Sequence, residues 1–390
     1  MNRITSVRAA AVTNPAALGR AKIDRWHDEI DHMNPLASDG RYGGQSARFE
    51  PPWGETICVI TVEDGTWGIG MTALSGLTVP MINDYFAPML VGDDASDVER
   101  LWQMMTTASG AHFGTGGGAS YAISAVDLAL WDLRGKQHGQ PVFELIAGER
   151  ASSLQAIPCY ATGLDLEAYR DLGFEAFKLA CPWGPDLSAS LDRTIELVER
   201  SRSIVGATAD LMLDCWGVHS PDEAVAIGEA VRGYGLGWIE DFIFPEDWAG
   251  YEEVRRRLPD LTLAAGERWY TDRPFQSAIE HGWVDIVQPD ALWVGGATPT
   301  IIIAEMAAEA EVGLSVHCGG NDSYGQHLSY SLPGSLWAET YIGPLATNAS
   351  FDSYRSTPGM ARPASGYLEP SDAPGFGIEL TLTDIERATR

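Results

Sequence analysis

The stretch Leu211-Met212-Leu213-Asp214 is a short apolar run that ends on a carboxylate, and Gly237-Trp238-Ile239-Glu240 repeats the pattern 26 residues later. Other apolar runs between residues 174 and 339 end in the same way on a polar or charged side chain, namely Lys178, Glu267, Asp290, His317 and Glu339. From Asp214 onward the intervals are 26, 27, 23, 27 and 22 residues, each long enough for one strand, one helix and two loops. The spacing predicts successive βα units in a parallel barrel, where all these strand ends face one rim.

A segment of different texture precedes this pattern. Residues 56–68 predict a strand, a turn at Asp64-Gly65 and a second strand, and apolar periodicity then predicts helices near residues 79–89, 95–107 and 120–137. The glycine-rich run 114–118 follows no evident strand and has no βαβ unit around it, so we interpret it as a flexible loop rather than a phosphate-binding cradle.

The length of 390 residues fits one large barrel with a smaller partner domain. The tail, residues 355–390, is rich in proline and glycine, and we expect it to pack back on the first domain. We therefore predict an α/β protein in which an α+β capping domain, residues 1–150 completed by the tail, covers a (β/α)7β TIM-like barrel formed by residues 151–354.

Composition excludes several classes of partner. The net charge of −28 repels nucleic acid and anionic lipid, and no apolar run reaches the length of a membrane span. The N-terminus lacks the apolar core of a secretion signal. The chain has five cysteines, an odd number without a CxxC pair, which is typical of a reduced, cytoplasmic protein.

Three of the strand-end carboxylates, Asp214, Glu240 and Glu267, fall on consecutive predicted strands. They would repel one another without a cation, and ligation by oxygen alone suits Mg²⁺, with Mn²⁺ as a substitute. Zinc would prefer nitrogen or sulfur. Cys215 lies next to Asp214, but strand alternation turns its side chain to the other face. A structural salt bridge is the alternative for each carboxylate taken singly.

The next two strands end on Asp290 and His317. A carboxylate beside an imidazole orients the ring and raises its basicity, so the pair suits removal of a proton from carbon next to a carboxylate. A metal opposite such a base would stabilise the resulting enediolate. A hydrogen-bonded rim histidine is the structural alternative for His317. Glu339 is expected either to bind the enediolate or to pair with Arg268.

Several segments together resemble the mandelate racemase branch of the enolase superfamily, and within it the rhamnonate dehydratase family. They are residues 123–136, 160–163, 183–185, 211–216, 288–290 and 374–377. The resemblance implies metal ligands at Asp214, Glu240 and Glu267, a catalytic dyad of His317 with Asp290, and a polar stabiliser at Glu339. Lys178 matches the lysine of the second barrel strand.

The resemblance also has departures. Many relatives carry Lys-x-Lys where this chain has Lys178-Leu179-Ala180, and the missing second lysine favours a dehydratase over a two-base racemase. Glu267 is followed by Arg268 and Trp269 instead of two histidines, so Arg268 is expected to contact the substrate and Trp269 to narrow the pocket. The resemblance further implies substrate contacts at His32, Arg48, Trp183 and His327, with a surface role as the alternative for His32 and Arg48 and a structural role for His327.

These observations predict a magnesium-dependent dehydratase of a sugar acid. It would remove water from a 2,3-dihydroxy acid with five or six carbons and release a 2-keto-3-deoxy acid. The resemblance implies a homo-oligomer, such as an octamer. The alternatives are an epimerase or cycloisomerase that uses the same enediolate, and a catalytically silent protein that binds metal and sugar acid.

Overall fold

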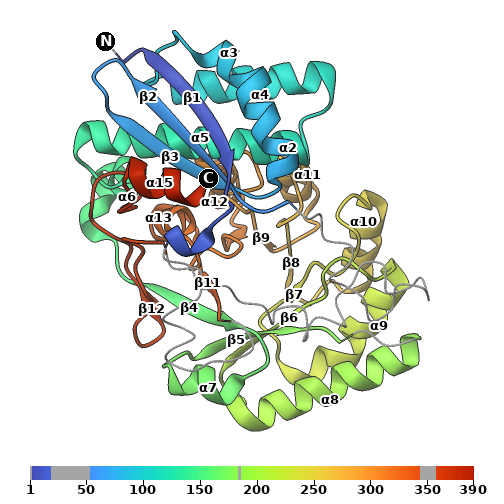
Figure 1. The fold of residues 1–390 in the computed structure, drawn as a ribbon. Coiled ribbons are helices and arrows are strands. Elements are labelled where there is room, and N and C mark those ends of the chain that lie inside the picture. The colour runs from blue at the N-terminus through green and yellow to red at the C-terminus, as the bar shows by residue number, and fades with distance from the viewer. Residues whose placement is uncertain (1, 19–52, 183–185, 343–356) are drawn as a thin grey trace.

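The structure is a computed structural model that describes residues 2–18, 53–182, 186–342 and 357–390. An N-terminal part of sheet and helices lies against a barrel of alternating strands and helices (Figure 1). The described N-terminal strands form a three-stranded antiparallel sheet in the order β1 (Ile4–Ala11), β2 (Thr56–Val62), β3 (Trp67–Thr72). The turn between β2 and β3 has Gly65 at φ 87°, and the Asp64 side chain accepts a hydrogen bond from Thr66 N at 2.8 Å, as the Asp64-Gly65 pair predicts.

Helices follow this sheet: α2 (Ser75–Pro80), a π-helical turn (Met81–Phe86), α3 (Ala87–Leu90), α4 (Val98–His112) and α5 (Gly118–His138). Helix α5 packs closely on β3 because the strand carries Gly68 and Gly70. A Cβ at Gly70 would lie 1.9 Å from the carbonyl oxygen of Ala125, and one at Gly68 would lie 2.1 Å from that of Ala129. Any larger residue at these two positions would push the helix off the sheet. The glycine run 114–118 joins two helices, as expected for a loop.

Within residues 157–342, apart from 183–185, eight parallel strands alternate with seven helices. The strands are β4 (Ile157–Thr162), β5 (Ala176–Ala180), β6 (Asp210–Asp214), β7 (Ile239–Glu240), β8 (Leu263–Ala265), β9 (Ile286–Val287), β10 (Gly313–Leu314) and β11 (Ala338–Tyr341). A parallel bridge from Leu314 to Ser335 connects β10 with the segment before β11, and β11 pairs with β4. The sheet thus closes on itself, which confirms the predicted (β/α)7β fold.

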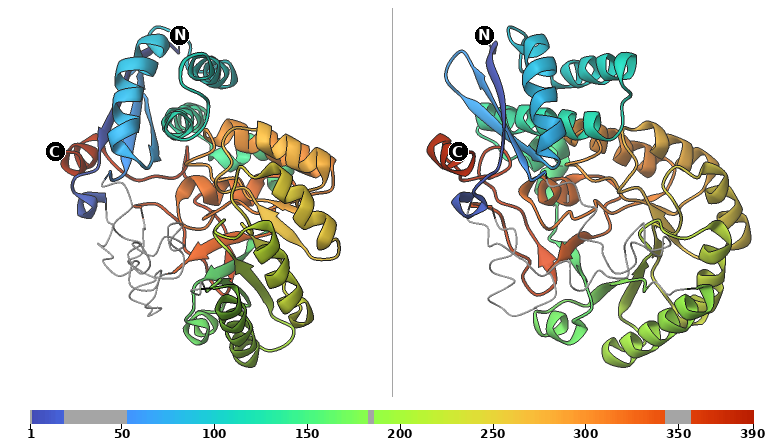
Figure 2. Two further views of the ribbon diagram at one scale, coloured as in Figure 1. Left: turned by 90° about the vertical axis from the view of Figure 1, so that its right-hand side faces the viewer. Right: turned by 45° about the vertical axis from the view of Figure 1, so that its right-hand side comes forward.

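The barrel helices wrap around the outside of the strands (Figure 2). They are α7 (Leu166–Asp171), α8 (Leu187–Val205), α9 (Pro221–Val231), α10 (Trp248–Arg257), α11 (Arg273–His281), α12 (Ala297–Glu309) and α13 (Ser323–Ser331). Helix α9 begins at Pro221, where the N-cap residue Ser220 and Glu223 of the first turn form a capping box. Among the described residues, no helix combines the length and the apolar character that crossing a membrane requires.

The described C-terminal residues contact both parts of the molecule. Strand β12 (Tyr367–Leu368) pairs antiparallel with β4, and α15 (Leu382–Ala388) ends where the Ala388 carbonyl accepts a hydrogen bond from Thr13 N at 2.8 Å. Between them, Gly375 O accepts from Val142 N at 2.8 Å, just before α6 (Val142–Ala147) and the 3-10 turn Gly148–Ser153. The expected domain limits at residues 150 and 354 stay a prediction.

Strand alternation builds the barrel interior in layers. One layer is apolar and consists of Tyr160, Ala176, Met212, Trp238, Ala264 and Ile286, with Trp337 packed against it. Two residues further along β5, β6 and β7, on the same faces, come Lys178, Asp214 and Glu240. A dry floor therefore lies beneath a charged layer at the carboxyl ends of the strands.

A buried carboxylate joins the N-terminal part to the barrel. Asp127 of α5 has no exposed surface, and it accepts hydrogen bonds from Thr298 N at 2.9 Å and Thr298 Oγ1 at 2.6 Å. Thr298 is the second residue of α12, so Asp127 supplies from another helix the cap that the N-cap residue, Gly296, does not provide. Burial raises the pKa of Asp127 to about 7, although the hydrogen bonds from Thr298 act to lower it. When the carboxyl is ionised, its charge faces the positive end of the α12 dipole.

We expect Asp127→Ala to lower the free energy of unfolding by about 1–3 kcal/mol, because it leaves the buried Thr298 N–H without this acceptor. Chemical denaturation measures the loss. Asp192→Ala, at an exposed position of α8, is the matched control and should change stability by less than about 0.5 kcal/mol. Equal effects of the two substitutions would contradict the capping role.

Candidate active site

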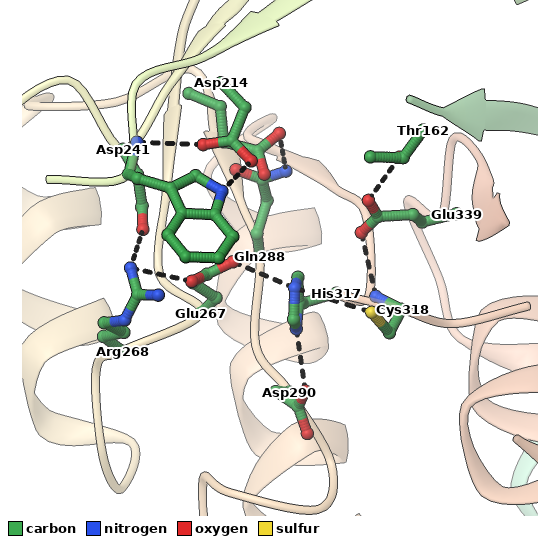
Figure 3. Close-up of polar contacts among 12 residues, drawn as sticks. Thr162, Asp214, Asp241, Glu267, Arg268, Gln288, Asp290, His317, Cys318 and Glu339 are labelled. Carbon is green, nitrogen blue, oxygen red and sulfur yellow. Dashed lines mark hydrogen bonds and ion pairs between the residues drawn. The ribbon is translucent and has the colours of Figure 1, made fainter. Parts of the chain in front are cut away.

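The strand-end residues singled out in the sequence meet at one end of the barrel, where their side chains form a network of charged contacts. Figure 3 labels Asp214, Glu267, Asp290, His317 and Glu339 of this network. Each of these strand-end residues except His317 is at most 4% exposed, and the His317 side chain is 12% exposed. The members of this rim network are Lys178, Asp214, Glu240, Glu267, Asp290, His317 and Glu339. Seven positions that are distant in the sequence therefore share one buried cluster.

Lys178 lies at the centre of the carboxylates. Its Nζ contacts Glu240 Oε1, lies 2.8 Å from Glu339 Oε1 and 3.7 Å from Asp214 Oδ2. The side chain is 1% exposed, and the Tyr160 ring lies 5.5 Å from the ammonium, on the apolar side. Burial alone would lower the pKa of Lys178, but Glu240 and Glu339 hold that pKa well above its usual value. The lysine is therefore a fixed positive charge.

Asp214 and Glu240 are oriented by indole and amide donors. Trp216 donates to Asp214 through its backbone N and its ring Nε1, both at 3.0 Å. Glu240 Oε2 accepts from Trp238 Nε1 at 2.8 Å and from Gln288 Nε2 at 2.7 Å. Burial, followed by the negative charge of Glu240, raises the pKa of Asp214 well above the usual value.

His317 bridges two carboxylates. Its Nδ1 lies 2.7 Å from Asp290 Oδ2, and its Nε2 lies 2.9 Å from Glu267 Oε2, so the ring points into the rim network (Figure 3). The Asp290 carboxylate is held in turn by Leu292 N at 2.7 Å, and the Trp293 ring packs 5.0 Å from the imidazole. Burial alone would lower the pKa of His317, but Cys318, Glu267 and Asp290 raise it well above its usual value.

Glu339 faces the rim network from the other side. Its Oε1 accepts from Thr162 Oγ1 at 2.6 Å, and its Oε2 accepts from the backbone N of Cys318 at 2.9 Å (Figure 3). Burial would raise the pKa of this carboxyl, but the charges of Lys178 and His317 hold the pKa at about 2. Glu339 is thus kept ionised. Its ion-pair partner is Lys178 and not Arg268, which was one of the two expectations.

Arg268 points into the network, where its Nη1 lies 2.9 Å from Glu267 Oε1 and 3.5 Å from Asp241 Oδ2. Its guanidinium also lies 5.2 Å from the centre of the Trp216 ring. Burial alone would raise the pKa of Glu267, but Arg268 and then His317 hold that pKa below its usual value. Arg268 therefore belongs to the site and lies beside the carboxylates of Glu267 and Asp241.

The charge of this cluster tests whether a cation fits. Among the described residues, the rim network and its neighbours Asp241 and Arg268 bring together six carboxylates, two cations and the imidazole of His317. The carboxylates are Asp214, Glu240, Asp241, Glu267, Asp290 and Glu339, and the cations are Lys178 and Arg268. Asp241 Oδ2 is buried without a hydrogen-bond donor, although Arg268 lies within ion-pair range. This excess of buried oxygen donors fits a hard divalent cation such as Mg²⁺, which Asp214, Glu240 and Glu267 would hold.

Two expected pocket residues lie elsewhere. The Trp269 indole donates to Pro245 O at 2.9 Å and packs against aromatic rings of α10 and α11, on the helix side of the barrel, so the expectation that it narrows the pocket is wrong. His327 packs against Phe143 and Phe376 and accepts from Phe143 N at 3.2 Å, and burial lowers its pKa to about 3. The other expected contacts, His32, Arg48 and Trp183, lie outside the described residues.

Sequence reasoning missed several residues that surround the rim network: Thr162, Trp216, Asp241 and Gln288. Two of them carried a signal. Gln288 is two residues before Asp290 and follows β9, and Asp241 directly follows Glu240. The Thr162 hydroxyl offered none, because its contact with Glu339 spans 177 residues and depends on closure of β11 onto β4.

Comparison with models of known protein families assigns the chain to a family. A model described as "Mandelate racemase / muconate lactonizing enzyme, N-terminal domain" matches residues 54–147, and one described as "Enolase C-terminal domain-like" matches residues 164–385. The second match alone covers more than half of the chain. The chain therefore belongs to the enolase superfamily, in its mandelate racemase group.

Individual relatives narrow the likeness further. The chain is 32% identical over 391 residues to an L-rhamnonate dehydratase of Saccharopolyspora erythraea, covering 97% of this chain and 96% of that protein. A putative L-rhamnonate dehydratase of Caldivirga maquilingensis is 32% identical over 329 residues, which is 84% of this chain and 81% of the relative. A crystal structure of rhamnonate dehydratase from Gibberella zeae complexed with Mg has a similar fold, with a TM-score of 0.85 at 24% identity, covering 99% and 96% of the two chains.

The central position of Lys178 generates a stability prediction. Lys178→Met keeps the length of the side chain but leaves three buried carboxylates without their shared cation, so the metal-free protein should lose about 3–5 kcal/mol of stability. Thermal and chemical denaturation in a chelator measure the loss, and added Mg²⁺ should recover part of it by binding the folded state.

Lys136→Met is the matched control. Lys136 lies 2.6 Å from the buried Asp132, but that carboxylate also accepts from Ile69 N and Phe376 N, so a loss of about 1–2 kcal/mol is expected. If Lys178→Met cost no more than this control, the ammonium would not be what balances the rim network.

Proposed function

We propose that this protein is a magnesium-dependent hydro-lyase that converts a sugar acid into a 2-keto-3-deoxy acid. The observation that carries the proposal is the His317–Asp290 pair, which faces a cluster of acidic oxygens with an unbalanced negative charge. A base beside a cation site suits removal of the weakly acidic proton next to a carboxylate. The named relatives are L-rhamnonate dehydratases, and the related crystal structure is a complex with Mg.

His317 serves as the base in this proposal. Because Nδ1 is engaged by Asp290, Nε2 is the nitrogen that faces the interior of the site and takes the proton from C2 of the substrate. Asp290 fixes the ring orientation and stabilises the imidazolium that forms. When the site is filled by substrate and metal, Nε2 would exchange its present contact with Glu267 for the substrate.

The carboxylates of Asp214, Glu240 and Glu267 would hold the metal. Bound there, Mg²⁺ would supply the positive charge that stabilises the substrate carboxylate as negative charge develops on it. Lys178, a permanent cation in the same layer, adds electrostatic stabilisation on the side of Glu339. Glu339 is kept in place by Thr162 and Cys318 N to bind the polar part of the substrate.

Elimination then needs an acid for the departing 3-hydroxyl. The protonated His317 can return the proton to that oxygen, so that water leaves and the enol formed becomes the 2-keto-3-deoxy acid. A second base would be expected near Ala180, which lies at the end of β5 in register with Asp214 of β6. Its methyl group cannot transfer a proton, which supports a one-base elimination over a two-base racemisation.

The substrate is an aldonate with five or six carbons, and Arg268 contributes to its selection through the charge it adds beside Glu267. We expect the enzyme to act as a homo-oligomer, as the family resemblance implies, and in the cytoplasm, as its cysteine content indicates.

A screen of stereochemically diverse aldonates with Mg²⁺, detecting 2-keto-3-deoxy acid, tests the function. At least one five- or six-carbon acid should be dehydrated, and a chelator should abolish turnover that Mg²⁺ restores. Substrates that isomerise without loss of water would instead identify an epimerase or cycloisomerase. A panel without any conversion by metal-loaded protein would contradict the proposal.

His317→Asn should lower kcat by at least about 10²–10⁴-fold, because it removes the base while leaving the metal ligands intact. Exchange of the substrate α-proton in heavy water should disappear together with turnover, whereas Mg²⁺ affinity should stay close to that of the unsubstituted protein. The control is His281→Asn on α11, an exposed residue whose ring stacks on Trp283. It should leave both kcat and the rate of α-proton exchange unchanged. Undiminished α-proton exchange in His317→Asn would remove this residue from the mechanism.

A further inference from the structure

The outer face of strands β5 and β6 carries a second cluster of metal-ligating side chains. Cys181 follows β5, Cys215 follows β6, and His219 lies in the loop before α9. Their ligand atoms, two Sγ and an imidazole nitrogen, all lie within 4.8 Å of one another, and each residue is at most 5% exposed. These residues have no part in the chemistry proposed for the rim network.

The backbone explains why they meet. Ala180 and Asp214 are in register, and the ladder continues one residue further, since Cys181 N donates to Asp214 O at 2.7 Å and Cys215 N to Glu240 O at 2.9 Å. The two cysteines are thus neighbours on adjacent strands. Because Asp214 points into the barrel, Cys215 points outward. Cys181 also faces outward, and its Sγ lies 3.6 Å from Thr194 Oγ1 on α8.

The imidazole reaches this face through a tight loop. Trp216 and Gly217 have φ values of +55° and +68°, and these two left-handed residues fold the chain back on itself. Val218 N then donates to Cys215 O at 3.4 Å, and His219 Nε2 comes within 3.9 Å of Cys181 Sγ. Trp216 is a non-glycine residue at positive φ, a strained backbone conformation. The same turn also orients Trp216 toward Asp214.

We infer that Cys181, Cys215 and His219 form a binding site for a thiophilic divalent cation, Zn²⁺, separate from the magnesium site. Tetrahedral zinc with its usual bond lengths separates sulfur and nitrogen ligands by about 3.6 Å and two sulfurs by about 3.8 Å. The 3.9 Å between Cys181 Sγ and His219 Nε2 is close to the first value, and all the ligand atoms lie within 4.8 Å of one another. Two thiolates and a neutral imidazole balance the charge of Zn²⁺, so the buried site is neutral overall, and the two thiol protons pass to solvent on binding. The fourth position is left for water or the Thr194 hydroxyl.

The test uses cadmium as a spectroscopic probe for the zinc site, with saturating Mg²⁺ to occupy the hard-cation site. The full-length protein should bind one equivalent with a thiolate-to-cadmium absorption band, and Zn²⁺ should displace it. Cys181→Ser and His219→Gln should each weaken binding by more than about a hundredfold, since even loss of an outer partner of a metal ligand costs roughly 10- to 100-fold. Circular dichroism tests whether each variant is folded. If Cys181→Ser does not fold, His219→Gln still tests the site, because it keeps both thiols.

Cys159→Ser is the matched control, because Cys159 is a buried thiol of β4 that lies outside the cluster, and it should leave the band and the affinity unchanged. Cys318→Ser tests the thiol beside His317 and should also leave the band intact. Loss of the band in Cys318→Ser with retention in Cys181→Ser would overturn the inference. An intact mass lower by two hydrogen atoms, with no cadmium bound and with the difference absent from Cys181→Ser, would also overturn it by identifying a disulfide of Cys181.

Discussion

The burial of like charges at the mouth of the barrel is the constraint on which the rest of this site depends. Six carboxylates converge there against few cations, and Lys178 alone lies within 4 Å of three of them. Such a cluster is stable only if every remaining oxygen has a donor or a counter-ion. The indoles of Trp216 and Trp238, the amide of Gln288 and the Thr162 hydroxyl donate to Asp214, Glu240 and Glu339 and fix the orientation of these carboxylates.

The surrounding fold makes this charged layer possible. An apolar layer fills the barrel beneath it and excludes water from that side of the charges. Above it, α5 is joined to α12 through Asp127, and the C-terminal segment hydrogen-bonds Asp132 through Phe376 N. One strand end also serves two faces, because Asp214 points into the barrel and Cys215 points outward. Successive residues of β6 thus lie in a hard, oxygen-rich environment and in a soft, sulfur-rich one.

The sequence alone was sufficient for the architecture and for most of the site. Intervals of 22 to 27 residues between charged strand ends indicate βα units, and parallel strands bring their carboxyl ends to the same rim. Strand alternation, which is a local rule, was enough to assign Asp214, Glu240 and Lys178 to the interior and Cys215 to the exterior. The order of the strand ends also predicted Asp290 beside His317, the family resemblance implied that they form a catalytic dyad, and the two side chains are in contact in the structure.

What the tertiary structure alone decided are the contacts that depend on how strands and helices pack across long sequence separations. Neighbouring residues diverged, since Arg268 turns inward to Glu267 whereas Trp269 turns outward to the helices. His327 packs on α6 and the C-terminal segment, and the thiols of Cys181 and Cys215 meet an imidazole through a loop with two left-handed residues. Periodicity specifies the face of a strand on which a side chain lies, but strand register, barrel closure and loop conformation specify what it meets there, and these are set by the packing of the whole chain.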